Sequence, residues 1–586
     1  MADDQQSDGQ KLPDTCLPTW GIAELPAPKP LGLHNLAGFI GPGIVMCGIQ
    51  LAGGEWLLGS EITARYGGSL MWIAGVAILV QVFYNMECGR YALYCGEPVF
   101  TGFMRAKPGP SFWISIFVLL SVGSLIPGLS THAAAVLTAL ILNKVPGEED
   151  RWLVTALAFV LVGAVTLPIL LGGKIYNMMQ WVMTTKVFVV LGFCMIMGVL
   201  FVSPANWASV VSGFFKVGTV PVVRGEDHND NGILDAGEDF DRDGNLDVVE
   251  TIQEQDQYGR ITQFDDIDGD GKWDGENVGN LFLLRLREGE WPTLFLTQIA
   301  LLGAFAGYAG GGGLGNSTYS NYCRDKGWGM GSQVGAIPSA VGGRNVTLSH
   351  IGKVFELNSE NMRHWHAWWK YIITDQVLVW GPGCLMGMAL PALISLEFSS
   401  HSELFRNPAR LDWAQAIISA DGIRNAPNFS PLMQQFLWVA TLIVGLLVLL
   451  PSQMSIVEDF CRRWTDIIWS GSRRVRETMQ PHQVVRIYYT ILVIYVFWSF
   501  LCAWYFTRFE SPKVMVLVIA NLNNIGLGIT AFLLLRNNLA YLPKAIRPGW
   551  IHCIGIFMCG VFYLGMAALV FYNKQLPMIY ELLGWN

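Results

Sequence analysis

Hydrophobic residues in this chain gather into long blocks that are apolar on every side. Runs such as 187–202 and 436–450 carry no charge and no polar stripe of the kind found on a surface helix of a soluble protein. Such runs are typical of membrane-spanning helices, which need about 20 predominantly apolar residues. The pattern predicts about eleven spans, at residues 36–60, 69–94, 112–142, 151–172, 179–202, 293–322, 367–395, 430–452, 484–507, 512–535 and 549–573.

Two of these spans are interrupted by glycine-rich stretches at matching places. The first break (residues 48–56) lies in the first span, and the second break (residues 307–316) lies in the sixth. Glycine lets the backbone unwind, and the groups that this frees are tolerated at membrane depth only beside a cavity or substrate. Paired breaks in two halves indicate a transporter's binding site. The substrate-binding residues predicted in this way are Ala52, Gly53, Gly54, Glu55, Gly310, Gly311, Gly312 and Asn316.

The order of the spans predicts an all-α membrane protein made of two five-helix halves with two discontinuous helices. Because five is odd, the halves have opposite topologies, as in an inverted repeat. Lys and Arg gather after even-numbered spans, which predicts a plasma (bacterial inner) membrane protein with a cytoplasmic N-terminus and an outer C-terminus. The expected parts are a disordered cytoplasmic tail (1–35), a first five-helix repeat (36–202), an acidic extracellular insert (203–292), a second five-helix repeat (293–535) and an eleventh helix with the C-terminus (536–586).

The composition is typical of a membrane protein, and its net negative charge lies in one segment. Charged residues make up only 14% of the chain, against about 25% in an average soluble domain. The net charge is −8, but the stretch 224–290 alone holds 20 acidic and 6 basic residues. The rest is therefore mildly basic. The sequence shows neither a basic stripe for nucleic acid nor the nucleophile–base pair or phosphate loop of an enzyme. The expected partners are a lipid bilayer and a small cation or organic substrate.

The acidic insert contains three calcium-loop patterns. Asp227–Glu238 and Asp239–Glu250 each place oxygen ligands and a central Gly at the spacing of the 12-residue calcium loop. A third pattern, Asp266–Asn277, ends on Asn instead of Glu. The predicted ligands, some through their backbone carbonyls, are Asp227, Asn229, Asn231, Ile233, Asp235, Glu238, Asp239, Asp241, Asp243, Asn245, Asp247, Glu250, Asp266, Asp268, Asp270, Lys272 and Asp274. The first two loops abut with no room for helices, so we expect structural calcium that supplies the insert's folding energy.

Ionisable and amide side chains inside the predicted spans are candidates for ion binding or coupling, because such groups are costly at membrane depth without partners. Glu55 is predicted to be a direct or water-mediated cation ligand, or a proton carrier; the alternative is that it ends a helix nearer the outer interface. The other coupling candidates are Glu87, His132, Asn521 and Asn524. A hydrogen-bonded structural role explains His132 equally well.

The first two spans resemble those of the natural resistance-associated macrophage protein (Nramp) family of divalent-metal transporters. The matching pieces are Gly41-Pro-Gly43, the Gly-x-Trp at Gly54–Trp56, and Ala64–Trp72, and the later segment Leu450–Ser455 is also similar. The resemblance implies the leucine-transporter-type fold of the amino acid–polyamine–organocation superfamily. It also implies a symporter that works by alternating access.

The metal-site residues depart from the pattern of that family. The family's first break typically reads Asp-Pro-Gly-Asn, whereas the matching positions here are Ala52 to Glu55, and no Met, Pro or His occurs from Gly303 through Tyr322. A thioether ligand favours softer transition metals, whereas sites made only of oxygen favour hard ions. The substrate expected here is therefore a hard, partly hydrated divalent cation such as Mg²⁺ or Mn²⁺. Two alternatives are an amino acid or other small organic solute carried by the same fold, and a non-transporting calcium-responsive receptor.

Overall fold

The structure is a computed structural model that describes residues 15–30, 32, 41–51, 53–125, 128–170, 174–222, 252–255, 261–264, 278–288, 291, 299–339, 346–404, 414–508 and 512–576. Within these ranges, nine helical segments are long and apolar enough to cross a membrane. They are α4 (Met71–Cys95), η3 with α7 (Val122–Leu142), η4 to η5 with α8 (Glu148–Leu170), α9 (Ile175–Phe201), α15 to η8 with α16 (Ser359–His401), α19 (Pro431–Gly471), η10 with α21 (Pro481–Tyr505), the Val516–Tyr541 part of α22 (Pro512–Tyr541), and α23 with η12 (Trp550–Gln575). The prediction of a mainly helical membrane protein is confirmed.

The two predicted discontinuous helices are both broken in the structure. The first consists of α2 (Pro42–Gln50), the π-helix η2 (Gly53–Leu58) and α3 (Gly59–Tyr66). The second consists of α12 (Ile299–Tyr308), the 3₁₀-helix η6 (Gly313–Thr318) and α13 (Tyr319–Lys326). In the second break, Gly310, Gly312 and Gly313 have φ angles of 81°, 65° and 60°. Only glycine adopts this region without strain, which explains why the helix unwinds at this place.

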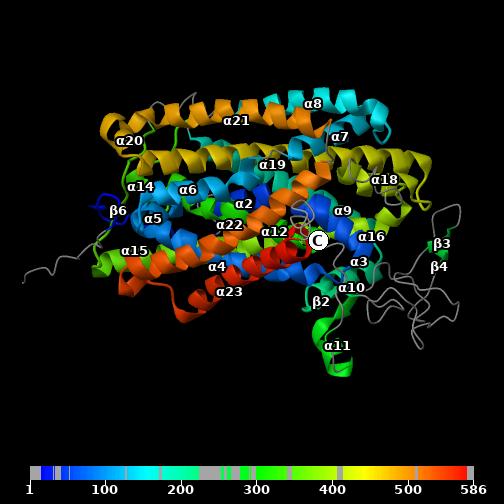
Figure 1. Cartoon of the computed structure of the whole chain (residues 1–586), viewed down its shortest axis with the longest axis horizontal. Helices are drawn as coiled ribbons and strands as arrows, with labels where there is room; N and C mark the ends of the chain where they lie inside the picture. The colour runs from blue at the N-terminus through cyan, green and yellow to red at the C-terminus, as the bar shows by residue number, and fades with distance from the viewer. Residues whose placement is uncertain are drawn as a thin grey trace, which may run out of the picture.

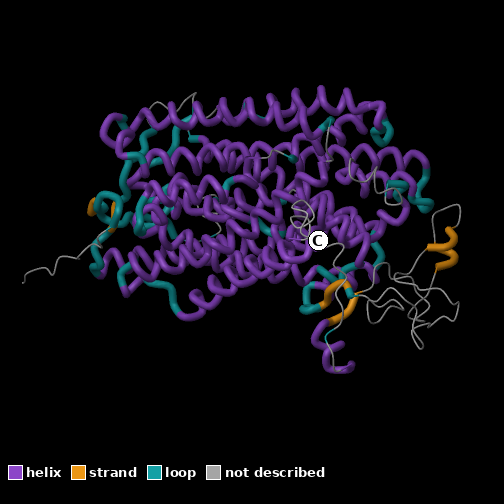
Figure 2. The backbone as a smooth tube through the Cα atoms, viewed as in Figure 1, coloured by secondary structure: helices purple, strands orange, loops and turns teal. Residues whose placement is uncertain are grey.

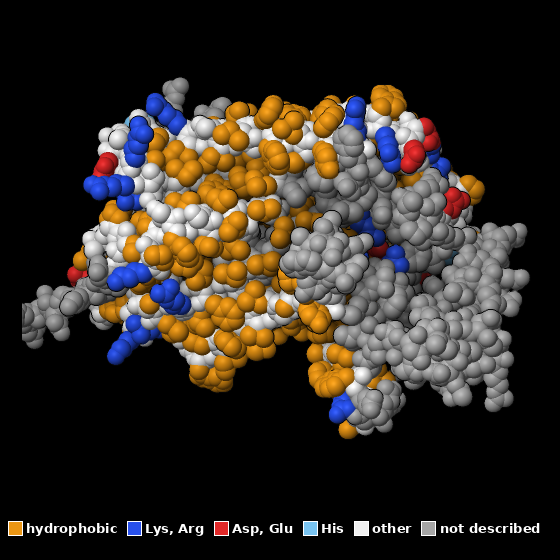
Figure 3. All heavy atoms as spheres, in the orientation of Figure 1, with side chains coloured by type: hydrophobic (Ala, Val, Ile, Leu, Met, Phe, Trp, Pro, Cys, Tyr) orange, Lys and Arg blue, Asp and Glu red, His pale blue; other side chains and the backbone are white. Residues whose placement is uncertain are grey.

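The helices run side by side along the long axis of the molecule, with α2 and α12 in the interior (Figure 1). The first half-helix α2 packs against α9, and α12 packs against α22. Figure 2 shows that strands are few and lie at the periphery. In Figure 3, apolar side chains cover the middle of the visible face, and Lys, Arg, Asp and Glu gather at its two ends. This distribution is expected of a protein whose middle lies in lipid.

Residues 15–30 correct the expectation of a disordered tail over 1–35. Their strand β1 (Gly21–Ile22) pairs in parallel with β6 (Lys353–Val354). Leu17, Trp20 and Leu25 are buried. Pro residues keep the segment out of a helix, and its apolar side chains pack onto the ends of the helix bundle. Residues 1–14 lie outside the described part of the chain.

The predicted insert, 203–292, is described only in pieces. It begins with α10 (Pro204–Gly213), and β2 (Thr219–Pro221) pairs antiparallel with β5 (Val278–Asn280). A further pair is formed by β3 (Ile252–Gln255) and β4 (Ile261–Phe264), and α11 (Leu281–Glu288) follows. These pairs add short strands to a fold expected to be wholly helical. All the predicted calcium ligands lie outside the described residues.

Candidate functional site

The two glycine breaks lie against each other in the interior of the bundle. A Cβ atom added to Gly54 would lie 2.5 Å from the backbone oxygen of Tyr308. A Cβ atom on Gly311 would lie 2.1 Å from the Nε2 atom of Gln50, at the end of α2. No larger residue fits at either place without displacing its neighbour, so these glycines allow the two interrupted helices to approach closely.

Gln81 on α4 satisfies the backbone groups that the second break frees. Its Oε1 atom accepts hydrogen bonds from the N–H of Gly311 at 2.8 Å and from Nδ2 of Asn316 at 2.7 Å. Its Nε2 atom donates to the carbonyl of Ala309 at 2.6 Å. Gln81 is fully buried, and buried backbone groups require partners. One side-chain amide therefore holds the unwound segment in a fixed conformation.

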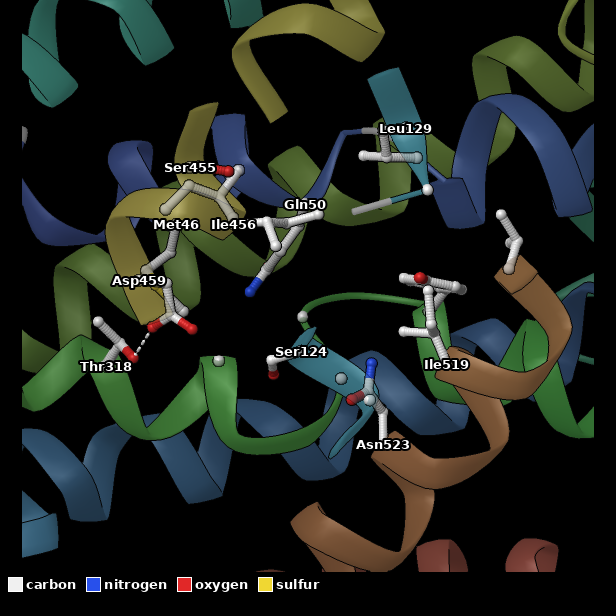
Figure 4. A pocket seen from close by; sticks show the side chains of 18 of the residues that line it. Met46, Gln50, Ser124, Leu129, Thr318, Ser455, Ile456, Asp459, Ile519 and Asn523 are labelled. Atoms are coloured by element: carbon white, nitrogen blue, oxygen red, sulfur yellow. Dashed lines mark hydrogen bonds between the residues drawn. The ribbon is translucent and has the colours of Figure 1, made fainter. Parts of the chain in front are cut away.

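A cavity of about 90 Å³ lies beside these breaks. A water molecule needs about 10–15 Å³ of such space, so the cavity has room for several. Figure 4 shows Gln50, Ser124 and Asn523 around one open space, with Asp459 at its side. The lining residues are Met46, Ile49, Gln50, Gly123, Ser124, Gly128, Leu129, Tyr308, Gly311, Gly312, Gly315, Thr318, Tyr322, Ser455, Ile456, Asp459, Val516, Ile519 and Asn523.

Asp459 on α19 is the one carboxylate among the described residues that line the cavity. It accepts a hydrogen bond from the hydroxyl of Thr318 (Figure 4), and its Oδ2 lies 3.3 Å from a guanidinium nitrogen of Arg463. Its side chain is 14% exposed. The carboxylate therefore has one cationic neighbour and retains access to the cavity.

Asp459 is not among the residues predicted from the sequence, because it lies beyond residue 452, where the eighth span was expected to end. In the structure, α19 continues through Pro451 to Gly471. The charges beyond Pro451 are paired within the protein, so the helix continues without exposing them to lipid. The signal was present in Glu458-Asp459 followed four residues later by Arg462-Arg463, a spacing that forms ion pairs on a helix.

An ion-pair network between α13 and α19 adjoins the cavity. Arg462 pairs with Glu458 at 2.5 Å and with Asp325, and Arg324 pairs with Asp325 at 2.8 Å and Asp466 at 2.6 Å. All five side chains are at most 1% exposed. The hydroxyl of Tyr322, a cavity residue, donates to Glu458 at 3.0 Å. The network fastens the second discontinuous helix to α19.

The predicted substrate-binding residues occupy different places relative to the cavity. Gly311 and Gly312 line it. Gly54 packs against α12, Gly310 lies against Gln81, and Asn316 donates to Gln81 and to Asn85. Gly53 and Glu55 belong to η2. Ala52 and the side chain of Glu55 lie outside the described part of the structure.

The coupling candidates other than Glu55 are absent from the described cavity lining. Glu87 is ion-paired with Arg90 at 2.9 Å and lies 3.0 Å from a ring nitrogen of His552. His132 is buried on α7. Asn521 and Asn524 donate to carbonyls of α12, at 3.0 and 2.8 Å. Their neighbour Asn523 is the α22 amide that lines the cavity.

The cavity offers oxygen ligands of low charge. Among the described residues, no group of three or more His, Cys, Asp or Glu side chains is placed to hold a metal ion. The lining combines one carboxylate, amides, hydroxyls and glycine backbone with the thioether of Met46 and with apolar side chains, which form most of its surface. Carboxylate, carbonyl and water oxygens suit Mg²⁺ and Mn²⁺, and Mg²⁺ usually keeps several of its waters.

Comparisons with known proteins give matches at the level of structure alone. No protein-family model matches the sequence, and no curated protein matches it significantly. A structure of the Eremococcus coleocola manganese transporter, in complex with an aromatic bis-isothiourea substituted compound, aligns over 94% of this chain and 97% of its own, with a TM-score of 0.51 and 11% identity. A single-residue variant of that transporter aligns over 95% and 91%, with a TM-score of 0.52 and 12% identity. The chain therefore has the fold of these transporter structures.

Proposed function

We propose that this chain is a secondary active transporter, distantly related to the Nramp family, that moves a hard divalent cation such as Mg²⁺ or Mn²⁺. The cation binds, partly hydrated, in the cavity beside the two breaks. The observation that carries the proposal is the meeting of Gln50, Gly311 and Asp459 around one small cavity beside the two breaks. Half-helix ends and unwound backbone at such a place are how membrane transporters hold ions.

The roles of the lining residues follow from their chemistry. Asp459 supplies the negative charge that draws a cation into a low-dielectric site. Asn523 and Thr318 supply neutral oxygens, which replace only part of the hydration shell. The Oε1 of Gln50 accepts a hydrogen bond from Nε1 of Trp380, so Gln50 presents its Nε2 to the second break. Because Arg463 offsets the charge of Asp459, the site holds the ion weakly enough to release it. This balance suits a carrier better than a permanent metal site.

The proposed repeats and membrane topology are those that the sequence predicts. Two five-helix repeats of opposite topology alternate the access of the cavity between the two sides of a plasma membrane. The N-terminus faces the cytoplasm, and the insert and C-terminus face outward. Glu55, in the first break, acts as a further ligand or as the proton carrier. Calcium binds the three loops of the insert and stabilises them as a folded cap on the outer side.

Flux measurements with the purified full chain in proteoliposomes test the proposal. The expected result is saturable uptake of Mg²⁺ or Mn²⁺ that Glu55→Gln abolishes or strongly reduces. Uptake of an amino acid or amine that is insensitive to both metals would replace the metal with an organic substrate. Absence of any flux, together with a calcium-dependent conformational change, would favour a receptor. Calcium is kept saturating in every assay so that the insert is loaded throughout.

A further inference from the structure

A second cavity lies at the outside of the bundle, between α19 and α21 (Val484–Phe506). Its volume is about 460 Å³, against about 90 Å³ for the cation cavity. Two residues of its wall, Ile494 and Trp498, are 64% and 43% exposed, so the cavity is an open groove. The lining residues are Leu125, Phe460, Trp464, Ile468, Ile491, Ile494, Tyr495 and Trp498.

The open wall of this groove is apolar, because two of its aromatic side chains use their polar atoms elsewhere. The hydroxyl of Tyr495 donates to the carbonyl of Ser124 at 2.7 Å, and the indole nitrogen of Trp498 donates to the carbonyl of Leu125 at 2.7 Å. Both acceptors belong to η3 (Val122–Leu125). Polar groups pay a desolvation cost against such a wall. The groove therefore favours an aliphatic occupant.

Arginines gather at one end of the groove. Ile468, in the wall, is followed by the end of α19 and by α20 (Arg473–Thr478). Arg474 on α20 and Arg486 in the first turn of α21 are exposed, whereas Arg473 is paired with Glu477 at 2.7 Å. Lys and Arg side chains cluster at the end of the molecule where α20 lies (Figures 1 and 3). Such clusters beside membrane helices attract anionic lipid headgroups.

The length of the groove matches one leaflet of a bilayer. A helix rises about 1.5 Å per residue, so Ile491 and Trp498 lie about 8 Å and about 18 Å along α21 from Arg486. Half of the hydrocarbon core of a bilayer is about 15 Å thick. A chain that begins at the level of the arginines therefore follows the groove from the interface to the middle of the bilayer.

We propose that the groove holds one acyl chain of an anionic phospholipid, whose phosphate is bound by Arg474 and Arg486. The apolar wall recognises the chain, and the arginines recognise the charge of the headgroup. A neutral phospholipid offers the same chain without that charge, so it binds more weakly. The site is separate from the cation cavity, with which it shares no lining residue among the described ones.

The lipid site and the cation cavity meet at η3. Leu125 lies in the wall of the groove, and its neighbour Ser124 lines the cavity. The hydrogen bonds from Tyr495 and Trp498 fasten α21 to these two residues. An acyl chain packed on both rings therefore stabilises one wall of the cavity. An effect of the lipid on uptake rests on the proposed transport function, but lipid binding does not.

Native mass spectrometry of the full chain tests the site. The delipidated protein, in detergent and saturating calcium, is titrated with dioleoyl phosphatidylglycerol or with dioleoyl phosphatidylcholine, which has the same chains. We expect one phosphatidylglycerol to bind the wild type about tenfold or more tightly than phosphatidylcholine does. Equal affinity for the two lipids, or several bound phosphatidylglycerols of equal affinity, would show only unspecific lipid contact and would overturn the inference.

Variants test the two parts of the site separately. Ile494→Trp fills the groove and should weaken binding of both lipids, whereas Val493→Trp, at the next and 69% exposed position, serves as its control. The double variant Arg474→Gln, Arg486→Gln should lose the preference for phosphatidylglycerol. Its control replaces two exposed lysines elsewhere, Lys370→Gln and Lys544→Gln. Binding by Ile494→Trp equal to wild type, or an unchanged lipid preference without the two arginines, would contradict the site.

Fluorescence locates the acyl chain. At one lipid per protein, phosphatidylglycerol brominated along its chains should quench part of the tryptophan emission of the wild type. Trp464→Phe with Trp498→Phe should remove that quenching, whereas Trp550→Phe, at an exposed position of α23, should keep it. Unchanged quenching in the double variant would place the chain elsewhere. The lipid preference of the wild type decides the question if a variant does not fold. None of these measurements requires transport, so a failure of metal flux leaves their outcome untouched.

Discussion

The side-chain oxygen of Gln81 accepts a hydrogen bond of 2.8 Å from the backbone N–H of Gly311, at the centre of the second break. The same amide donates to the carbonyl of Ala309 at 2.6 Å. A helix from the first half of the chain therefore supplies the partners that the unwound helix of the second half has lost. This side chain therefore helps to fix the position of Gly311, which lines the cavity.

Substitution Gln81→Leu removes those partners while it keeps an apolar side chain of similar size. Each buried group left unsatisfied costs about 1–3 kcal/mol, so we expect a lower unfolding temperature and a loss of ion uptake. The exposed Gln333→Leu on α14 (Gly331–Val334) serves as the control and should change neither property. Wild-type stability and uptake in Gln81→Leu would show that the second break holds its shape without this residue.

Two asparagines on α22 have different roles: one lines the cavity, and the other stabilises the helix packing through hydrogen bonds to backbone carbonyls. Asn523 lines the cavity, whereas Asn521 donates to the carbonyls of Ala300 and Leu517 at 3.0 and 2.8 Å. We expect Asn523→Ala to raise the KM for the cation with little change in unfolding temperature. Asn521→Ala should lower the unfolding temperature by the cost of lost hydrogen bonds, about 1 kcal/mol each. The reverse pattern in uptake kinetics and thermal unfolding would contradict the placement of the cavity.

How far the sequence predicts this site depends on the residue. The breaks were predictable because glycine clusters are rare inside apolar spans. In the structure, several of these glycines adopt positive φ. The position of the pairing could not be predicted, since the contact of Gly54 with Tyr308 joins residues more than 250 positions apart in sequence. Asp459 was missed because charges after Pro451 suggested a loop, and only tertiary ion pairs make them compatible with a buried helix.

Acid should loosen the ordered N-terminal segment. Arg105 donates to the carbonyl of Pro18 at 2.8 Å and is itself held by Glu97, with contacts of 2.5 and 2.8 Å. Burial raises the pKa of Glu97, but the Arg105 guanidinium outweighs burial and leaves that pKa below its usual value. The stability from this pair is therefore complete above the unfolded-state pKa of about 4.3 and is lost as the pH falls through the lower folded-state pKa.

Limited proteolysis of the N-terminus from neutral to acidic pH measures this effect. We expect residues 15–30 to become protease-sensitive only in strong acid in the wild type. Glu97→Gln should be sensitive already at neutral pH, because breaking a buried ion pair costs about 3 kcal/mol or more. Glu149→Gln, which alters an exposed ion pair with Lys144, is the control. Equal protease sensitivity of wild type and Glu97→Gln at neutral pH would show that Glu97 does not anchor this segment.

Calcium should order the acidic insert. The pairing of β2 with β5 brings the two ends of the insert together, and a segment poor in apolar residues gains its folding energy from bound metal. We expect calcium to protect the insert from protease in the wild type and to fail in the double variant Asp227→Asn, Asp239→Asn. Asp256→Asn lies between the loop patterns in sequence and should behave as wild type. Equal digestion of the wild-type insert with and without calcium would contradict the proposal that calcium stabilises it.

Mg²⁺ and Mn²⁺ uptake by proteoliposomes that contain wild type or Asp459→Asn, each with calcium saturating, would test metal binding in the cavity. Asp459 is the carboxylate of the proposed cation cavity, and its replacement by a neutral amide keeps the size of the side chain. We expect saturable wild-type uptake of one or both metals, with an apparent affinity weakened about tenfold or more by Asp459→Asn, while Asp256→Asn transports normally. Identical metal uptake by wild type and Asp459→Asn, or no metal uptake by the folded wild type, would contradict it.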